Sequence, residues 1–285
     1  MEIKSLRNIE YDLLYSSFRK AFKDYDIQLT KDELFSMLQR RGFVAELSFG
    51  AFDKGQIVAF TFNGIGVYNN IKTAYDTGTG TIEEYRGKGL ASQIFEYSLP
   101  YLREAKVEHY LLEVLQHNTK AISVYQKLGF KTQREFYYFI QEEPLKTNDK
   151  TTDSSITIKT IDMPRREITE EFSDFVPSWQ NSFDAISRKQ DDFKIQGAFI
   201  DNELTGYCIS EPETGDITQI AVNKNHRRKG IGTLLFKESL IHNKCQTVKI
   251  VNTAIDCDSI NKFAESQGLS VTGKQFEMIK DLKLS

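Results

Sequence analysis

The sequence predicts a mixed α/β (α+β) fold built from two similar domains, and three observations support this prediction. The chain has 285 residues, which is long for one domain and enough for two domains with separate cores. Strand and helix patterns alternate along the chain and restart after its middle. A basic turn of the form Arg-x-x-Gly-x-Gly/Ala occurs at 86–91 and again at 227–232. We therefore expect an internal duplication.

Apolar spacing in the first half predicts a strand, two helices and then several strands around the first turn. Thr30 and Glu33 have the spacing of a capping box, so a helix should begin just after Thr30. Asp53-Lys54-Gly55 is typical of a tight hairpin connection. The expected strands are 1–6, 44–52, 56–67, 74–82, 109–115 and 130–140; the expected helices are 9–22, 31–38, one with the apolar stripe Leu90, Ile94, Tyr97 and Tyr101, and one that begins at Asn118.

The second half repeats much of this order. We expect strands at 156–161, 194–200, 203–210 and 216–222, with a mostly helical segment at 167–188. Gly50-Ala51-Phe52 recurs as Gly197-Ala198-Phe199 on the matching hairpin strand. Residues 141–155 are rich in charges and hydroxyls with a single aliphatic residue, which is typical of a linker. The predicted domains are 1–141 and 156–285, joined by a linker at 142–155.

The composition excludes several classes of protein. A net charge of -3 gives no general attraction to nucleic acid or to an anionic membrane. The three cysteines form no Cys-x-x-Cys pair, so neither a disulfide framework nor a zinc cluster is indicated. The first 14 residues carry five charges, and no later stretch resembles a membrane span. We expect a cytoplasmic monomer or homodimer.

The repeated turn connects a strand to a helix. Glycines there let the backbone approach a ligand, and the first N–H groups of the helix favour an anion. A Walker loop ending at Gly87-Lys88 would need Gly at Ile82, and a dinucleotide fingerprint starting at Gly87 would need Gly at Ser92, so both fail. A cofactor that carries phosphate is still the expected ligand.

The turn resembles the acyl-CoA pyrophosphate loop of the GNAT acetyltransferase superfamily, Gln/Arg-x-x-Gly-x-Gly/Ala after the fourth strand. The resemblance implies two domains, each with a mostly antiparallel central sheet and helices on both faces, and acetyl-CoA as cofactor without a metal. It also implies that the strand before the loop pairs with the pantetheine arm. The cofactor-binding residues expected on this basis are Gly80, Thr81, Ile82, Arg86, Gly87, Lys88, Gly89, Leu90 and Ala91 in the first domain, and Val222, Arg227, Arg228, Lys229, Gly230, Ile231 and Gly232 in the second.

A later motif of the same family is similar to residues 118–130, Asn118-x-x-Ala-x-x-Val-Tyr125-x-x-Leu-Gly-Phe. Tyr125 lies on the apolar stripe of its helix, so it faces the sheet. An inward aromatic is ordinarily a core residue, whereas the motif implies that Tyr125 donates a proton to the leaving thiolate. A phenol pKa of about 10 suits a thiol pKa of about 8.5. Asn118 is expected to bind CoA, to cap its helix, or to do both.

Several carboxylates are candidates for the general base. Glu83, just after the fourth expected strand, and Glu113, on the fifth, are the two candidates that we place first. Asp76 and Glu84 are neighbouring carboxylates, and ordered water is the alternative to all of them. The aromatic residues Phe18, Phe22, Tyr25 and Tyr137 either line the acceptor groove or belong to the core.

The second domain departs from the motif. Aligning Gly268 with Gly129 places Ala264 at the position of Tyr125 and Cys257 at that of Asn118. We therefore assign chemistry to the first domain, while the second either binds CoA without turnover or has a structural role. The leading hypothesis is an N-acetyltransferase that acetylates a primary amine of a small molecule, peptide or protein. The alternatives are a CoA-binding or structural scaffold, and a nucleic-acid protein using the basic residues at 226–229, which the acidic balance disfavours.

Overall fold

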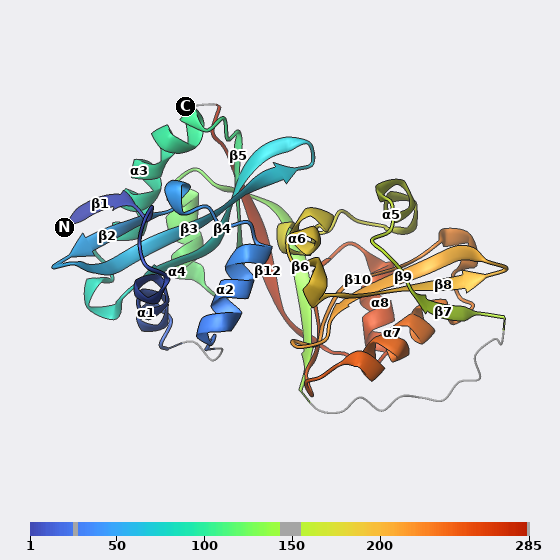
Figure 1. Ribbon diagram of the computed structural model, residues 1–285. Coiled ribbons are helices and arrows are strands. Elements are labelled where there is room, and N and C mark those ends of the chain that lie inside the picture. The colour runs from blue at the N-terminus through green and yellow to red at the C-terminus, as the bar shows by residue number, and fades with distance from the viewer. Residues whose placement is uncertain (25–27, 143–154, 284–285) are drawn as a thin grey trace. The chain divides into compact units, whose positions relative to one another are not determined.

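The computed structural model (Figure 1) describes residues 1–24, 28–142 and 155–283, and the chain divides into two compact units. Unit 1 consists of Met1–Gln133 and Phe276–Ser285, and unit 2 consists of Arg134–Gln275. Both units are mixed α/β, as the sequence predicts. The expected linker lies almost wholly outside the described residues, since 143–154 are not among them.

Unit 1 is built on a mostly antiparallel sheet with the strand order β1-β2-β3-β4-β5-β12, in which only β4 and β5 are parallel among β1 to β5. On β3, Phe60 and Phe62 pack against α1 and α2, while Ala59 packs against α3, so helices cover both faces (Figure 1). The elements are β1 (Glu2–Ser5), α1 (Tyr11–Ala21), α2 (Lys31–Arg40), β2 (Phe49–Asp53), β3 (Gln56–Tyr68), β4 (Ile71–Thr81), α3 (Leu90–Glu104), β5 (His109–Leu115), α4 (Thr119–Lys127) and the end of β12 (Val271–Asp281).

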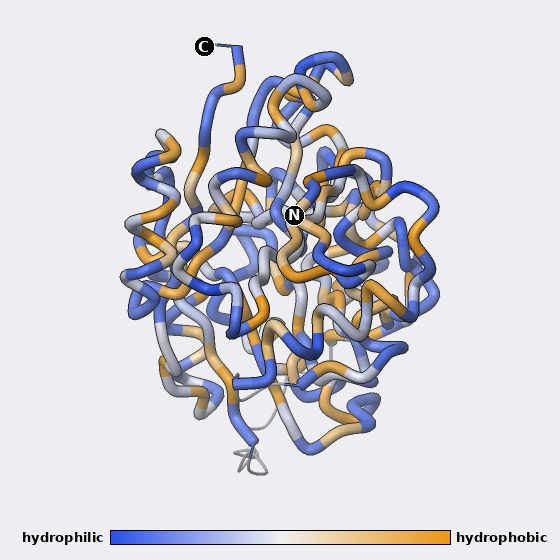
Figure 2. The backbone as a smooth tube through the Cα atoms, turned by 90° about the vertical axis from the view of Figure 1, so that its left-hand side faces the viewer, coloured by the Kyte–Doolittle hydropathy of each residue, from blue (hydrophilic) through white to orange (hydrophobic). Residues whose placement is uncertain are grey.

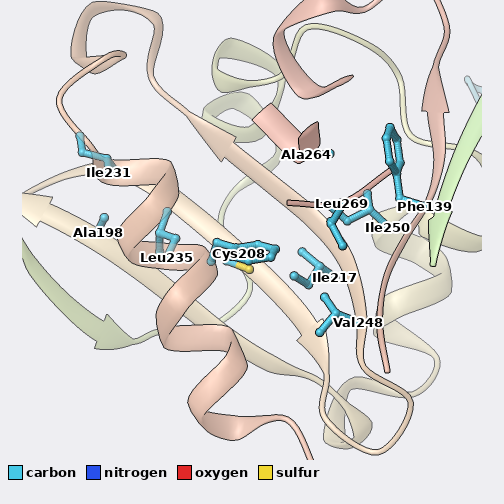
Figure 3. Close-up of a cluster of buried hydrophobic side chains, with 11 residues drawn as sticks. Phe139, Ala198, Cys208, Ile217, Ile231, Leu235, Val248, Ile250, Ala264 and Leu269 are labelled. Carbon is cyan, nitrogen blue, oxygen red and sulfur yellow. The ribbon is translucent and has the colours of Figure 1, made fainter. Parts of the chain in front are cut away.

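Unit 2 has the strand order β6-β11-β10-β9-β8-β7, again with one parallel pair, β10 and β11. On β9, Tyr207 and Ile209 pack with α5 and α6, whereas Cys208 points to the cluster around α7 and α8 that Figure 3 shows. The elements are β6 (Lys131–Gln141), β7 (Thr157–Thr160), α5 (Arg166–Phe172), α6 (Phe183–Ser187), β8 (Lys194–Ile200), β9 (Glu203–Glu211), β10 (Asp216–Val222), α7 (Ile231–His242), β11 (Val248–Ala254) and α8 (Asp258–Ser266).

The unit boundaries differ from the expected boundaries, because each unit takes its last strand from the other half of the chain. Strand β6 begins in unit 1, but its residues Phe136–Gln141 pair with β11 of unit 2. Strand β12 ends in unit 1, where Met278 is buried in the core and the N–H of Leu282 donates to Glu108 O at 2.8 Å. Alternation along a strand specifies its buried face rather than the strand beside it. The exchange therefore leaves no trace in the pattern.

Several local predictions are confirmed and two are wrong. The capping box of Thr30 and Glu33 is present, and Lys54 and Gly55 of the first hairpin both have positive φ, as a tight turn requires. The segment 167–188 contains the helices α5 and α6 with a 3-10 turn between them, as expected, whereas the strand expected at 44–52 begins only at Phe49, because 45–47 form a 3-10 turn. On α3 the buried stripe runs through Phe95, Ser98 and Leu102 beside Leu90 and Ile94; Tyr97 and Tyr101 are 38% and 41% exposed.

Hydrophobic residues form short runs broken by hydrophilic ones along the chain, as Figure 2 shows. Among the described residues, no helix is both long and apolar enough to cross a membrane.

Candidate active site

Strands β4 and β5 separate part of the way along unit 1. They pair only from Thr73 and His109 to Tyr75 and Leu111, although β4 continues to Thr81 and β5 to Leu115. Beyond Tyr75 the two described strand edges do not pair with each other, so an extended amide chain can hydrogen-bond there as a strand would. In unit 2, β10 and β11 pair only at Asp216 and Lys249 and then separate in the same way. Each unit therefore has an opening at the same place in its sheet.

Each opening leads to one copy of the repeated loop. Gly89 and Gly230 are the N-caps of α3 and α7, both are left-handed, with φ of 72° and 85°, and a glycine has no side chain that could cap the helix. The first N–H groups of both helices therefore have no intrahelical acceptor and favour an anion. A Cβ at Gly87 or Gly230 would meet no atom within 4 Å, so backbone conformation rather than crowding explains these two glycines. Arg228 takes the position of Gly87 in unit 2 and also has a positive φ, of 64°.

The first arginine of each loop is held by the protein itself. Arg86 donates to Thr81 O at 3.2 Å, to Ala21 O at 3.0 Å and to Asp24 at 3.1 Å. Arg227 does the same in unit 2, where its partners are Val222 O at 3.0 Å, Phe172 O at 2.9 Å and Asp174 at 2.7 Å. Both guanidinium groups thus clamp the end of a strand to the end of a helix. The remaining basic side chains of the loops, Lys88, Arg228 and Lys229, are exposed, and the ammonium of Lys88 lies over the ring of Tyr85 at 4.5 Å from its centroid.

The strand residues expected to bind the cofactor lie beside these loops, but some have packing roles. A Cβ at Gly80 would lie 2.7 Å from Phe60 Cζ and 2.9 Å from Ala21 Cβ, so this glycine lets α1 approach β4. The N–H of Ile82 already donates to Val58 O at 2.9 Å. Asn118 accepts from the N–H of Ala121 at 3.2 Å, so the N-cap function predicted for it is present.

Tyr125 and Asp76 come together at the point where β4 and β5 separate. Asp76 is the first residue of β4 after the paired stretch, and Thr77 beside it is a β-bulge, unpaired between Asp76 and Gly78. The phenol of Tyr125, on α4, donates to Asp76 Oδ2 at 3.4 Å. Thr79 Oγ1 donates to the same oxygen at 2.7 Å, and the N–H of Gly78 donates to Oδ1 at 2.9 Å.

Burial raises the pKa of Asp76 from its ordinary value to about 6, against the effect of its hydrogen bonds to Thr79, Gly78 and Tyr125 and of the nearby charge of Arg41. A carboxylate with a pKa near neutrality is a better proton acceptor than an ordinary aspartate. The sequence places Glu83 and Glu113 before Asp76 as candidates for the general base. One sequence signal points to Asp76: it stands two residues before Gly78, a spacing typical of an Asx turn.

The two glutamates lie in different places. Glu83 is in a 3-10 turn after β4, exposed, and pairs with Lys23 at 2.5 Å. Five residues of β4 separate Asp76 from Thr81, about 16 Å at the usual rise, so Glu83 lies near the loop rather than near Tyr125. Glu113 is on β5 and accepts a hydrogen bond from Tyr75, which helps to raise the pKa of that phenol, after the larger effect of burial.

The aromatic candidates for an acceptor groove do not form one group. Phe18 and Phe22 pack together, with ring centroids 4.6 Å apart, against the cluster of α1, α2 and β3. Tyr137 belongs to unit 2 because of the strand exchange. Tyr25 lies outside the described residues.

Unit 2 has aliphatic residues where unit 1 has its titratable groups. Ile217, which precedes the bulged Thr218, replaces Asp76. Ala264, seven residues after its helix N-cap as Tyr125 is, replaces the tyrosine. Val251 takes the place of Glu113, two residues beyond the last strand pair. Ile217 and Ala264 belong to one buried apolar cluster, which Figure 3 shows.

The other face of the opening in unit 2 is bridged by the chain itself. Asn181 Nδ2 donates to Val251 O of β11 at 2.8 Å, and Gln219 Nε2 of β10 donates to Asn181 O at 2.6 Å. Gln219 also accepts from Tyr207 at 3.0 Å. In unit 1 the corresponding residue after the bulge is Gly78, which has no side chain to fill the opening. A pocket remains in unit 2 between Ile217, Ile220, Ile250 and Thr253.

Within 1–24, 28–142 and 155–283, no group of three or more His, Cys, Asp or Glu side chains could hold a metal ion. The cradle that is present, exposed helix N-termini with basic loops beside an unpaired strand edge, fits a ligand that combines phosphates with an amide-bearing arm. This fold and cradle define an acyl-CoA-dependent transferase.

The family model described as "Acetyltransferase (GNAT) family" matches residues 8–130 and 161–265, one region in each half. The chain therefore belongs to the GNAT acetyltransferase family and is a tandem member of it, and the family uses acetyl-CoA. An N-alpha-acetyltransferase MAK3 of Arabidopsis thaliana is 30% identical over 112 residues, 38% of this chain and 59% of that protein. N-alpha-acetyltransferase 30 of Schizosaccharomyces pombe is 27% identical over 117 residues, 40% of this chain and 78% of that protein. This chain thus spans less than two thirds of the Arabidopsis relative.

Two solved structures have the same fold over the whole chain. A tandem GNAT protein from the clavulanic acid biosynthesis pathway has a TM-score of 0.75 at 12% identity, covering 100% of this chain and 99% of its own. A GCN5-related N-acetyltransferase from Sphaerobacter thermophilus has a TM-score of 0.73 at 13% identity, covering 99% and 95%. At these identities the likeness concerns the fold alone.

Proposed function

We propose that this protein transfers an acetyl group from acetyl-CoA to a primary amine by direct attack, and that unit 1 carries the chemistry. The observation that carries this proposal is the contact between Tyr125 and Asp76 at the separation of β4 and β5. A proton donor and a carboxylate at such an opening suit a reaction in which an amine loses a proton and a thiolate gains one. Acetyl-CoA, when bound, supplies an activated acetyl thioester.

The residues of unit 1 divide this task. The N–H groups at the start of α3 and the side chain of Lys88 hold the phosphates, and the unpaired edge of β4 holds the arm. Tyr125 protonates the thiolate sulfur. Arg86 keeps the loop in place through its clamp and does not contact the cofactor.

Unit 2 does not turn over in this proposal. Ile217, Val251 and Ala264 cannot accept or donate a proton, and Asn181 and Gln219 bridge β10 and β11 on one side of the opening, beside the pocket that remains there. Its intact loop and clamp support a structural role for the second copy.

The test is CoA release from acetyl-CoA by the full chain, followed with a thiol-reactive dye across a panel of small amines and peptides with free α-amines. Tyr125→Phe should lower kcat about 10²- to 10³-fold, as expected for loss of a general acid. Tyr97→Phe, a matched change at an exposed position on α3, should keep the wild-type rate. Wild-type protein that acetylates no amine, or a Tyr125→Phe variant at full rate, would contradict the proposal.

A peptide or protein α-amine is the second candidate for the acceptor. It is favoured by the two relatives named as N-alpha-acetyltransferases. Mass spectrometry of peptides with and without a blocked N-terminus separates α-amine acetylation from acetylation of a lysine side chain or of a small amine.

A further inference from the structure

Asp76 lies between elements that cover opposite faces of the unit 1 sheet. Tyr125 reaches it from α4, while Arg41, which follows α2, donates to the carbonyl of the adjacent Thr77 at 3.3 Å. The β-bulge at Thr77 and the end of the β4–β5 pairing coincide at this residue. Asp76 therefore contacts the phenol on α4, and its neighbour Thr77 contacts the end of α2.

The hydrogen bonds of Asp76 fix the direction of its carboxylate. Gly78 N–H holds Oδ1, and Thr79 and Tyr125 both donate to Oδ2. Tyr125 donates to Oδ2, so this oxygen can, once protonated, return a proton to the phenolate. Glu83 is paired with Lys23 near the loop, and Glu113 accepts from Tyr75.

We propose that Asp76 is the general base of unit 1 and that it passes the proton it takes from the acceptor nitrogen to Tyr125, which has protonated the thiolate. This inference rests on the proposed function. The proton then travels from nitrogen to sulfur through two side chains without entering bulk water.

The reaction balances for a neutral amine. The C–N bond forms as Asp76 Oδ2 takes one proton from the nitrogen, and the C–S bond breaks as Tyr125 Oη gives its proton to sulfur. Asp76 then returns its proton to the phenolate oxygen. The products are the N-acetyl amide and CoA thiol, and both side chains regain their starting charge.

Several charged or titratable groups face Asp76. Arg41 lowers its pKa and Tyr125 hydrogen-bonds to it, while the charge of Asp76 adds to the effect of burial in raising the pKa of Tyr75 and of Tyr110. With burial dominant, the pKa of Asp76 is raised to about 6. The carboxylate needed to accept a proton is therefore lost as the pH falls through about 6.

The experiment compares wild type with Asp76→Asn in the full chain, with Glu96→Gln on the exposed surface of α3 as the matched control. We expect Asp76→Asn to lower kcat/KM about 10²-fold at pH 8. The ratio of wild-type to variant kcat/KM, in which ionisation of the amine cancels, should fall toward one as the pH drops through about 6. Glu96→Gln should give a ratio near one at all pH values.

A second readout needs neither acetyl-CoA nor an acceptor. The folded pKa of Asp76 is above its unfolded value of about 3.9, so its contribution to stability is present below about pH 4 and lost as the pH rises through 6. Thermal unfolding of Asp76→Asn should therefore match wild type at pH 4 and occur at a higher temperature at pH 8. A carboxylate with only a structural role would give a less stable variant.

The relay itself is tested by the double variant. If Asp76 acts by recharging Tyr125, the variant Asp76→Asn with Tyr125→Phe should be no more than about threefold slower than the slower single variant. A double variant slowed by the product of the two single effects would overturn the relay. If Asp76→Asn reacts within threefold of the wild-type rate, Asp76 is not the general base, although an active wild type still supports the proposed function. If the wild type acetylates no amine at all, the proposed function itself is overturned.

Discussion

Units 1 and 2 share a cofactor cradle but differ in what stands at the opening of the sheet. Both keep the left-handed glycine N-cap and the arginine clamp. At the opening, unit 1 has Asp76 and Tyr125, whereas unit 2 has Ile217 and Ala264. The clamp also holds the fold together, so it is retained without catalysis. A partly buried carboxylate costs stability, and the proposed chemistry gives a reason for its place in unit 1.

The largest expected difference between the units concerns their loops. Gly89→Asp places a negative charge where the N–H groups of α3 would hold phosphates, so it should abolish acetyl-CoA binding and raise KM beyond measurement. Gly230→Asp makes the same change at a matching left-handed N-cap in unit 2 and should have a far smaller effect. Calorimetric titration measures both, and we expect one tight site per wild-type chain. Equal losses from the two changes would show that both loops bind.

An aspartate introduced into unit 2 at the position that matches Asp76 should destabilise the fold. Ile217 is 2% exposed in an apolar cluster with Ala264, and no tyrosine stands opposite. Ile217→Asp should therefore destabilise the fold by about 3–5 kcal/mol, as a buried unpaired charge does. Ile217→Asn, which carries no charge, is the control and should cost less at pH 8. Urea unfolding measures both; a stable Ile217→Asp variant would mean that water reaches this position.

A smaller effect is expected at the bridge across β10 and β11. Asn181→Ala removes the hydrogen bond to Val251 O and leaves that carbonyl without this donor, which should cost about 1–3 kcal/mol. Asn225→Ala, an exposed change beyond β10, should cost little. Urea unfolding gives both values. If titration of Asn181→Ala instead showed a second acetyl-CoA site, the bridge would block ligand binding in unit 2 rather than stabilise the fold.

Local sequence signals predicted the parts of the fold that depend on neighbours in the chain. The capping box at Thr30 and the hairpin turn at Lys54 and Gly55, both with positive φ, could be predicted because turn geometry demands particular residues. The strands that pair with β6 and β12 could not be predicted, because alternation along a strand does not specify its neighbour in the sheet. In the candidate site, the motif around Tyr125 was readable, whereas the raised pKa of Asp76 arises from burial that only the folded chain creates.

The exchange of β6 and β12 has a consequence for the order in which the protein is made. The sheet of unit 1 is completed by Phe276–Asp281, and Met278 fills its core. A ribosome that has synthesised the loop, Asp76 and Tyr125 still holds an unfinished sheet edge until Phe276–Asp281 have emerged. Unit 1 therefore completes its sheet only after the residues of unit 2 have been synthesised.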